Sequence, residues 1–224
     1  MRATRIIQTV ALAVLLLAAA LPASAGTAGD PEITDLCGAQ VMTGETVRVT
    51  PNHVDICSGW FTTTASGLKV TLEMAGVVEE TGGFWAVWWR KGDCYYQVAV
   101  DDAPTAEHPQ SFTVGCGEPP EPECTPVVPL QCDFGQTQHP LPDNSVVRDG
   151  RQLRVTVDFA GPLSSYAAAH RSGSVLTQPH AAASATVGPV YAWMFGCSFA
   201  GDVNQCFEFN GDTTASGRPY TVGS

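Results

Sequence analysis

The chain has 224 residues, of which 11 are Lys or Arg and 22 are Asp or Glu, and its formal net charge is −11. Nucleic acids and anionic membranes bind surfaces rich in Lys and Arg, so this charge argues against both as partners. Hydrophobic residues make up 44% of the chain, which is enough for the core of one large or two small domains.

Residues 1–25 have the features of a signal peptide. Arg2 and Arg5 precede an apolar run over residues 6–21, and small residues occupy positions 23–25. The run is shorter than the roughly 20 residues that a membrane-spanning helix needs, and the small residues suit a signal peptidase. We predict cleavage after Ala25, which leaves residues 26–224 as a secreted, extracellular protein without a membrane anchor.

Strand patterns dominate the remainder of the chain. Apolar and polar residues alternate over residues 68–74, which places four apolar side chains on one buried face of a strand. Residues 153–159 repeat this pattern, and the dipeptide Ala-Gly directly follows each of the two runs. Gly, Pro, Asn and Asp separate most of the other predicted strands. These lie at residues 46–50, 54–63, 84–90, 95–100, 111–115, 175–178, 190–196, 205–209 and 220–222.

The balance of elements predicts an all-β fold. Only residues 164–170, a serine cap before an alanine-rich segment, have a helical pattern. About ten short strands and at most one short helix are typical of an antiparallel β-sandwich. We expect one domain over residues 26–224. The Pro-rich stretch 117–124 leaves open a tandem of two small sandwiches, 26–117 and 125–224.

All eight cysteines follow the predicted signal peptide, and an even number in an exported chain predicts disulfides. If strands 95–100 and 111–115 form a hairpin, Cys94 and Cys116 face each other across it. The cysteines lack the close spacing of a zinc site, so we expect no metal. The same reasoning across turns and loops gives the other pairs, Cys197 with Cys206, Cys124 with Cys132 and, by elimination, Cys37 with Cys57.

The order of several segments resembles a recurrent exported bacterial β-sandwich. These segments are residues 54–56, 67–76, the aromatic strand 85–89, Tyr95-Tyr96 and, later, residues 144–159 and 217–223. The chain is similar to DOMON-type domains and to family-nine carbohydrate-binding modules. The resemblance implies a single sandwich; members of this group bind a sugar or haem, or have no known ligand, so it leaves the function open. The eight cysteines depart from the cysteine-poor members of this group.

The aromatic strand is the best candidate for a binding site. It reads Phe-Trp-Ala-Val-Trp-Trp over residues 84–89, and we predict that Trp85, Val87 and Trp89 face one side while Phe84, Ala86 and Trp88 face the other. One set belongs to the core. The other either packs under a second layer or forms an open platform for a sugar ring, with Gln97 among the neighbours that bind its hydroxyls. The candidate ligand-binding residues are Trp60, Trp85, Trp88, Trp89 and Arg90.

Sequence motifs for catalysis are missing. The chain has no Gly-x-Ser-x-Gly, no His-Glu-x-x-His and no Gly-rich phosphate loop with Lys, so we expect no enzyme activity. Core packing accounts for Met74 and Met194, which a haem would need as ligands, and we expect no cofactor. The acidic and amide residues around position 202–212 lack the spacing of a calcium loop.

These observations predict a secreted, non-catalytic binding or structural protein whose partner is an extracellular glycan or another cell-surface component. The alternative is a secreted enzyme inhibitor or hydrolase that uses disulfide-fixed loops, above all residues 119–132. Burial of the four candidate tryptophans would remove the open platform.

Overall fold

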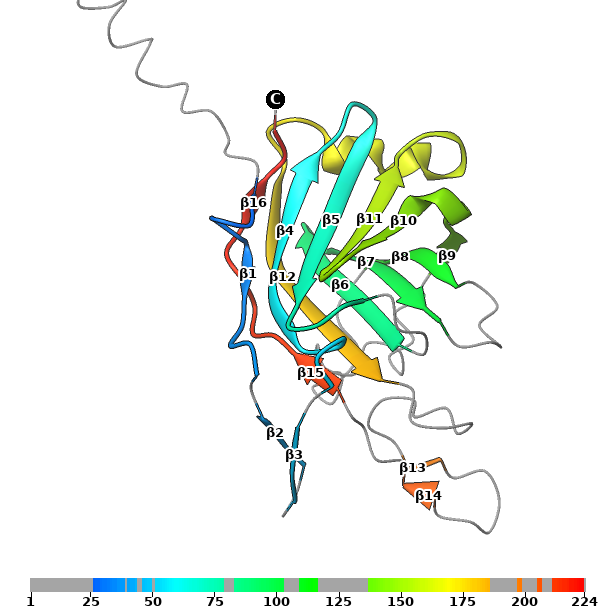
Figure 1. Cartoon of the computed structure of the whole chain (residues 1–224). Helices are drawn as coiled ribbons and strands as arrows, with labels where there is room; N and C mark the ends of the chain where they lie inside the picture. Colours follow the sequence, from blue (N-terminus) through cyan, green and yellow to red (C-terminus); the bar gives the residue numbers. More distant parts are fainter. Residues whose placement is uncertain are drawn as a thin grey trace, which may run out of the picture.

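The computed structural model describes residues 26–38, 40–43, 46–49, 51–78, 83–102, 109–116, 137–185, 197–198, 205–206 and 211–223. Within these residues, two antiparallel sheets lie face to face with the core between them (Figure 1). The predicted all-β sandwich is confirmed. Two short ladders complete the described strands, β2 (Gln40–Thr43) with β3 (Thr46–Val49) and β13 (Cys197–Ser198) with β14 (Gln205–Cys206).

The first sheet has five strands in the order β1-β4-β5-β11-β10. The two repeated sequence patterns are neighbours in it, because β5 and β11 pair with Val70 opposite Val155 and Leu72 opposite Leu153. All four side chains are buried, so the alternation that predicted these strands also gives their inward face. The strands are β1 (Ile33–Thr34), β4 (Ile56–Thr63), β5 (Gly67–Met74), β10 (Val146–Asp149) and β11 (Gln152–Asp158).

The second sheet has seven strands, in the order β15-β12-β6-β7-β8-β9 with β16 also paired to β12. Both sheets combine strands from either side of the Pro-rich stretch 117–124, so each half of the chain contributes to both layers. The strands are β6 (Gly83–Lys91), β7 (Cys94–Asp101), β8 (Gln110–Cys116), β9 (Thr137–Pro140), β12 (Val175–Ala185), β15 (Gly211–Thr213) and β16 (Tyr220–Thr221).

Aromatic rings fill the core between the sheets. The ring of Trp89 lies 5.5 Å from Phe61 of the opposite sheet in an edge-on arrangement and 6.0 Å from Tyr96 of its own sheet. An apolar cavity of about 10 Å³ lies between the sheets, lined by residues such as Val70, Trp85 and Leu153. It has room for about one water molecule, so a larger ligand does not fit it.

Helical structure in the described residues is limited to 3₁₀ turns. The predicted helical segment is the 3₁₀ helix η3 (Gly161–His170), whose Leu163 and His170 are buried, and a second turn, η2 (Asp143–Ser145), precedes β10. In Figure 1, η3 lies across one end of the sandwich. No helix among the described residues is long and apolar enough to cross a membrane.

Two of the predicted disulfides are present. Cys94 and Cys116 are paired residues of β7 and β8 with Cα atoms 4.1 Å apart, and Cys37 is bonded to Cys57 with Cα atoms 4.7 Å apart. The β13–β14 ladder places Cys197 opposite Cys206, the position that the predicted bridge needs. Cys124 and Cys132 lie outside the described residues.

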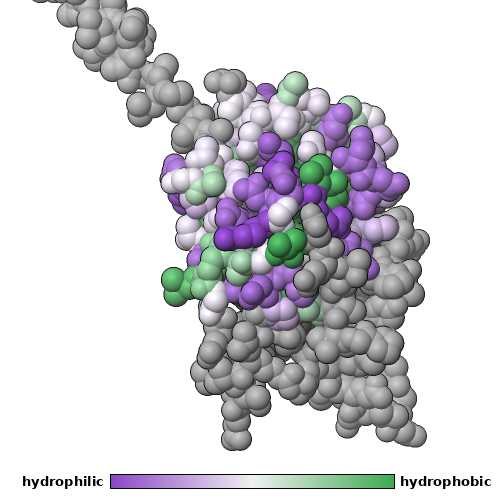
Figure 2. Space-filling view, in the orientation of Figure 1, coloured by the Kyte–Doolittle hydropathy of each residue, from purple (hydrophilic) through white to green (hydrophobic). Residues whose placement is uncertain are grey.

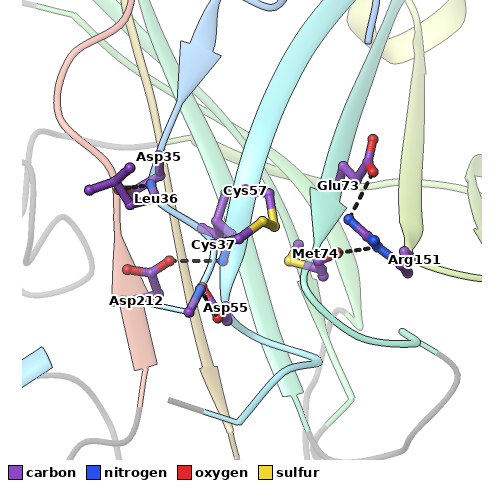
Figure 3. Close-up of a disulfide and its surroundings, with 11 residues drawn as sticks. Asp35, Leu36, Cys37, Asp55, Cys57, Glu73, Met74, Arg151 and Asp212 are labelled. Carbon is purple, nitrogen blue, oxygen red and sulfur yellow. Dashed lines mark hydrogen bonds and ion pairs between the residues drawn. A yellow bond between two sulfur atoms is a disulfide. The ribbon is translucent and has the colours of Figure 1, made fainter. Parts of the chain in front are cut away.

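Buried acids surround the Cys37–Cys57 bridge (Figure 3). Asp55 accepts a hydrogen bond from the Gly38 backbone N–H at 2.7 Å, and Asp212 accepts one from the Ile56 N–H at 2.8 Å. Burial raises the pKa of Asp55. Because Asp212 comes from the C-terminal part of the chain, this contact joins that part to β4, and the Cys37–Cys57 bridge joins the N-terminal part to the same strand.

Candidate functional site

Strand β6 separates its aromatic residues as the sequence predicts. Trp85, Val87 and Trp89 belong to the core between the sheets, whereas Ala86 and Trp88 belong to a separate cluster on the opposite face, against which Phe84 packs. The second set therefore lies on the outward face of the seven-stranded sheet. This face, rather than the interior, carries the candidate site.

Three outward side chains form a row across adjacent strands. Trp88 of β6 pairs with His180 of β12 on one side and with Gln97 of β7 on the other. The rings of Trp88 and His180 are stacked, with centroids 5.1 Å apart and planes 13° apart. We call these three residues the Trp88 row.

Each member of the Trp88 row has a buried polar atom without a hydrogen-bond partner. These atoms are Trp88 Nε1, Gln97 Nε2 and His180 Nε2. The three residues are only 4%, 6% and 7% exposed, respectively. An unpaired buried polar group costs about 1–3 kcal/mol, and most native proteins avoid it. Three such atoms in neighbouring positions on one face are therefore free to take hydrogen bonds from water or from a ligand.

His180 has a fixed tautomer. Its Nδ1 lies 3.0 Å from the carbonyl oxygen of Gln178, which only accepts hydrogen bonds, so Nδ1 carries the proton. Burial lowers the pKa of His180 and keeps the ring neutral. Nε2 therefore presents a free lone pair, and the Trp88 row offers two N–H donors and one acceptor.

A β-bulge sets the position of His180. The pairing of β12 with β6 shifts between Thr177 and His180, and Gln178 within the bulge has φ of 52°. This left-handed conformation is strained for a residue with a Cβ, and such strain concentrates at functional positions. The bulge brings the Gln178 carbonyl to the His180 ring.

Small residues flank the Trp88 row. Ala86 pairs with Ala182 and with Ala99, which makes an adjacent row of three buried alanines that packs with Trp88 in one cluster. On the other side, Arg90 pairs with Tyr95, and its guanidinium lies 5.1 Å from the centre of the tyrosine ring. The outward face thus changes from small apolar residues to a cation within four residues of one strand.

The structure divides the five residues that the sequence singles out. Trp88 and Arg90 share the outward face of β6, whereas Trp85 and Trp89 are core residues whose Nε1 atoms donate to the His53 carbonyl and to His170 Nε2. Trp60 belongs to the other sheet, where it pairs with Thr71. All four tryptophans are at most 8% exposed, so the open stacking platform is wrong.

The outward face of the five-stranded sheet has a different character. Its strand positions next to Trp60 include Lys69, Glu73 and Arg154, and Figure 2 shows a mainly hydrophilic surface with small separate hydrophobic patches. Arg154 pairs with Asp149, and Arg151 pairs with Glu73 at 3.0 Å. Exposed ion pairs of this kind contribute little and do not form a site.

Other candidate chemistry is not assembled in the described part of the chain. Met74 is fully buried in the core, and no group of three or more His, Cys, Asp or Glu there could hold a metal ion. His170 and His139 both have structural partners. His170 bonds to the Trp89 N–H and to the Tyr166 carbonyl, and His139 bonds to the Tyr166 hydroxyl. The predicted strand 190–196, Met194 and the loop 119–132 lie outside the described residues.

Comparisons with known proteins give no relative of this chain: no family model, no curated protein and no solved structure matches it. The resemblance to DOMON-type domains and family-nine carbohydrate-binding modules therefore stays a prediction.

Proposed function

We propose that this chain is an exported, non-catalytic β-sandwich protein that binds an extracellular glycan at the Trp88 row. The observation that carries the proposal is the set of three adjacent buried nitrogen atoms without partners. A ligand that supplies these hydrogen bonds recovers a cost that the free protein bears.

A hydroxyl-rich ligand matches the row. Trp88 Nε1–H and the Gln97 amide donate, whereas His180 Nε2 accepts, so the ligand must both accept and donate within a small area. Sugar hydroxyl groups do both. The stacked rings of Trp88 and His180 add an aromatic surface, the kind of surface on which the apolar face of a sugar packs.

Export is supported by the signal-peptide pattern of residues 1–25 and by the disulfides Cys37–Cys57 and Cys94–Cys116. Disulfides persist in oxidising compartments and are rare in the cytosol. A binding role, rather than catalysis, is supported by His180, whose bonded partner is a backbone carbonyl rather than a carboxylate that would activate it.

Titration of tryptophan fluorescence against a panel of soluble polysaccharides and oligosaccharides tests this proposal. We expect a ligand from the panel to change the emission, and we expect Trp88→Phe and Gln97→Leu each to weaken its binding about three- to ten-fold through loss of one hydrogen bond. Trp60→Phe is the matched control because it also changes a buried tryptophan, but in the other sheet. It should leave the affinity unchanged.

Thermal unfolding of the same variants separates a binding role from a structural one. Because Gln97 buries an unpaired polar atom, Gln97→Leu should keep or raise the melting temperature of the free protein while it weakens binding. Trp88→Phe also loses packed ring atoms, so it should lower the melting temperature slightly. Variants that lower the melting temperature and leave binding unchanged would show that these atoms serve the fold. A panel without any binder would contradict the glycan proposal directly.

A further inference from the structure

The first described residues fold back on themselves. Thr27 and Asp30 form a tight turn, with the Asp30 N–H donating to the Thr27 carbonyl at 2.9 Å. The turn brings Gly26 against the side chain of Glu32, just before β1. A Cβ atom at position 26 would lie only 2.0 Å from Glu32 Oε2, so glycine is the residue that fits there without moving the carboxylate.

The nitrogen of Gly26 is therefore close to this carboxylate. This nitrogen and a Cβ atom at position 26 would be bonded to the same Cα, so they would be about 2.5 Å apart. The nitrogen therefore lies within about 4.5 Å of Glu32 Oε2. Gly26 itself is buried, and the Glu32 side chain is 2% exposed. In the uncleaved chain this nitrogen is a neutral amide.

Glu32 has too little positive charge around it. Its Oε2 accepts the Phe61 N–H at 3.0 Å, and its Oε1 lies 3.5 Å from Arg218. Arg218 is closer to Asp30, at 2.7 Å, so two acids share one guanidinium. Burial raises the pKa of Glu32, in agreement with this imbalance.

We propose that cleavage between Ala25 and Gly26 creates a structural ion pair, in which the new α-ammonium group of Gly26 binds the buried carboxylate of Glu32. The proposal rests on the export proposed above. Hydrolysis of the peptide bond places a carboxylate on Ala25, which leaves with the peptide, and an amine on Gly26, which takes up a proton. The quartet of Gly26, Asp30, Glu32 and Arg218 is then neutral.

The consequence is a maturation step that strengthens the fold. Glu32 connects two parts of the fold. Its side chain accepts the N–H of Phe61 in β4, and its backbone carbonyl accepts the N–H of Arg218 in the C-terminal segment at 2.9 Å. A second cation at Glu32 therefore stabilises the junction of both chain ends with the five-stranded sheet. The pairing raises the pKa of the α-amino group, so its stabilising effect is present below about pH 8 and is lost as the pH rises through the raised value.

Chains that differ only at the amino terminus test this pairing. Protease release from an N-terminal fusion, followed by oxidative refolding, gives residues 26–224 with a free Gly26 amine and residues 25–224 with the amine one residue further away. Acetylation of the first product removes the charge and keeps the backbone. We expect the free Gly26 chain to melt about 2–4 °C above the other two at pH 7.

Glu32→Gln keeps an acceptor for the Phe61 N–H and removes the charge, so the three amino termini should then melt at the same temperature. Glu73→Gln is the matched control, because Glu73 belongs to the partly exposed ion pair with Arg151, and it should preserve the difference. NMR titration of the Gly26 α-amino group gives a second readout, with an expected pKa above the ordinary value of about 8.

Equal melting temperatures together with an ordinary amine pKa would overturn the proposal, even if Glu32→Gln failed to fold. Mass spectrometry of the exported protein separates the two proposals. Export with cleavage at another bond would contradict this inference and leave the proposed function intact, whereas loss of glycan binding would leave the ion pair unaffected.

Discussion

Two buried histidines on opposite faces of the seven-stranded sheet show how a residue's partners reveal its role. His170 uses both ring nitrogens, because Nδ1–H donates to the Tyr166 carbonyl and Nε2 accepts the Trp89 N–H at 2.9 Å. His180 uses Nδ1 alone and leaves Nε2 without a partner. The first histidine is therefore a structural residue, whereas the second has the unpaired atom that the proposed glycan would use.

The structural role of His170 predicts a pH dependence of stability. Burial lowers its pKa from 6.5 to about 4, so the unfolded chain binds a proton at a pH where the folded protein does not. The contribution is fully present above about pH 6.5 and is lost as the pH falls towards 4, by about 3 kcal/mol in total. Urea unfolding between pH 4 and 7 measures it.

His170→Gln is the control for this prediction, because the amide oxygen still accepts the Trp89 N–H but does not titrate in this range. The pH dependence should become smaller by about the same 3 kcal/mol, although other groups such as His180 still contribute. An unchanged pH profile in His170→Gln would show that His170 is not the titrating group.

At the scale of one element, the bulge in β12 connects backbone strain to the Trp88 row. Gln178 is exposed, so a substitution there changes backbone preference rather than packing. We predict that Gln178→Val is less stable than Gln178→Gly by about 1–2 kcal/mol, because only glycine adopts a positive φ without cost. Equal stabilities by chemical denaturation would mean that the bulge rearranges. His180 should then also lose its hydrogen bond to the Gln178 carbonyl.

The same strand shows what the sequence alone predicts and what it does not. The alternation in residues 68–74 and 84–89 correctly predicts which side chains share a face, because a pleated strand has a strict period of two. Only the beginning of β12 was predicted, as residues 175–178. Its second half, Pro-His-Ala-Ala-Ala-Ser-Ala, has weak strand propensity and is a strand because it pairs with β6 along its length.

The Trp88 row depends on information that no local pattern carries. Trp88 and Gln97 are close in sequence, but His180 joins them only through the register of β12 on β6. This limit also explains why the prediction of an open tryptophan platform was wrong. The alternation of residues shows on which face of a strand each tryptophan lies, but it does not show whether that face is covered. Pro179 in a strand was the available signal, because proline in a paired strand marks a bulge.

Across the whole fold, the two disulfides are large contributions to stability that substitution can measure separately. They close loops of 20 and 22 residues, and loop-closure entropy gives about 3 kcal/mol for each. The loops do not overlap in sequence, so their effects should add. Replacing both pairs with alanine then costs about 6 kcal/mol, which is comparable with the total stability of a typical domain.

Urea unfolding of Cys37→Ala/Cys57→Ala, of Cys94→Ala/Cys116→Ala and of the combined variant measures these contributions. Both double variants should fold with lower midpoints, and their slopes against urea should rise because the unfolded chain becomes more expanded. The Cys94–Cys116 bridge lies on the β7–β8 pair that contains Gln97, so its loss should weaken ligand binding more than loss of Cys37–Cys57. Equal binding in both double variants would show that strand pairing alone holds the Trp88 row in register.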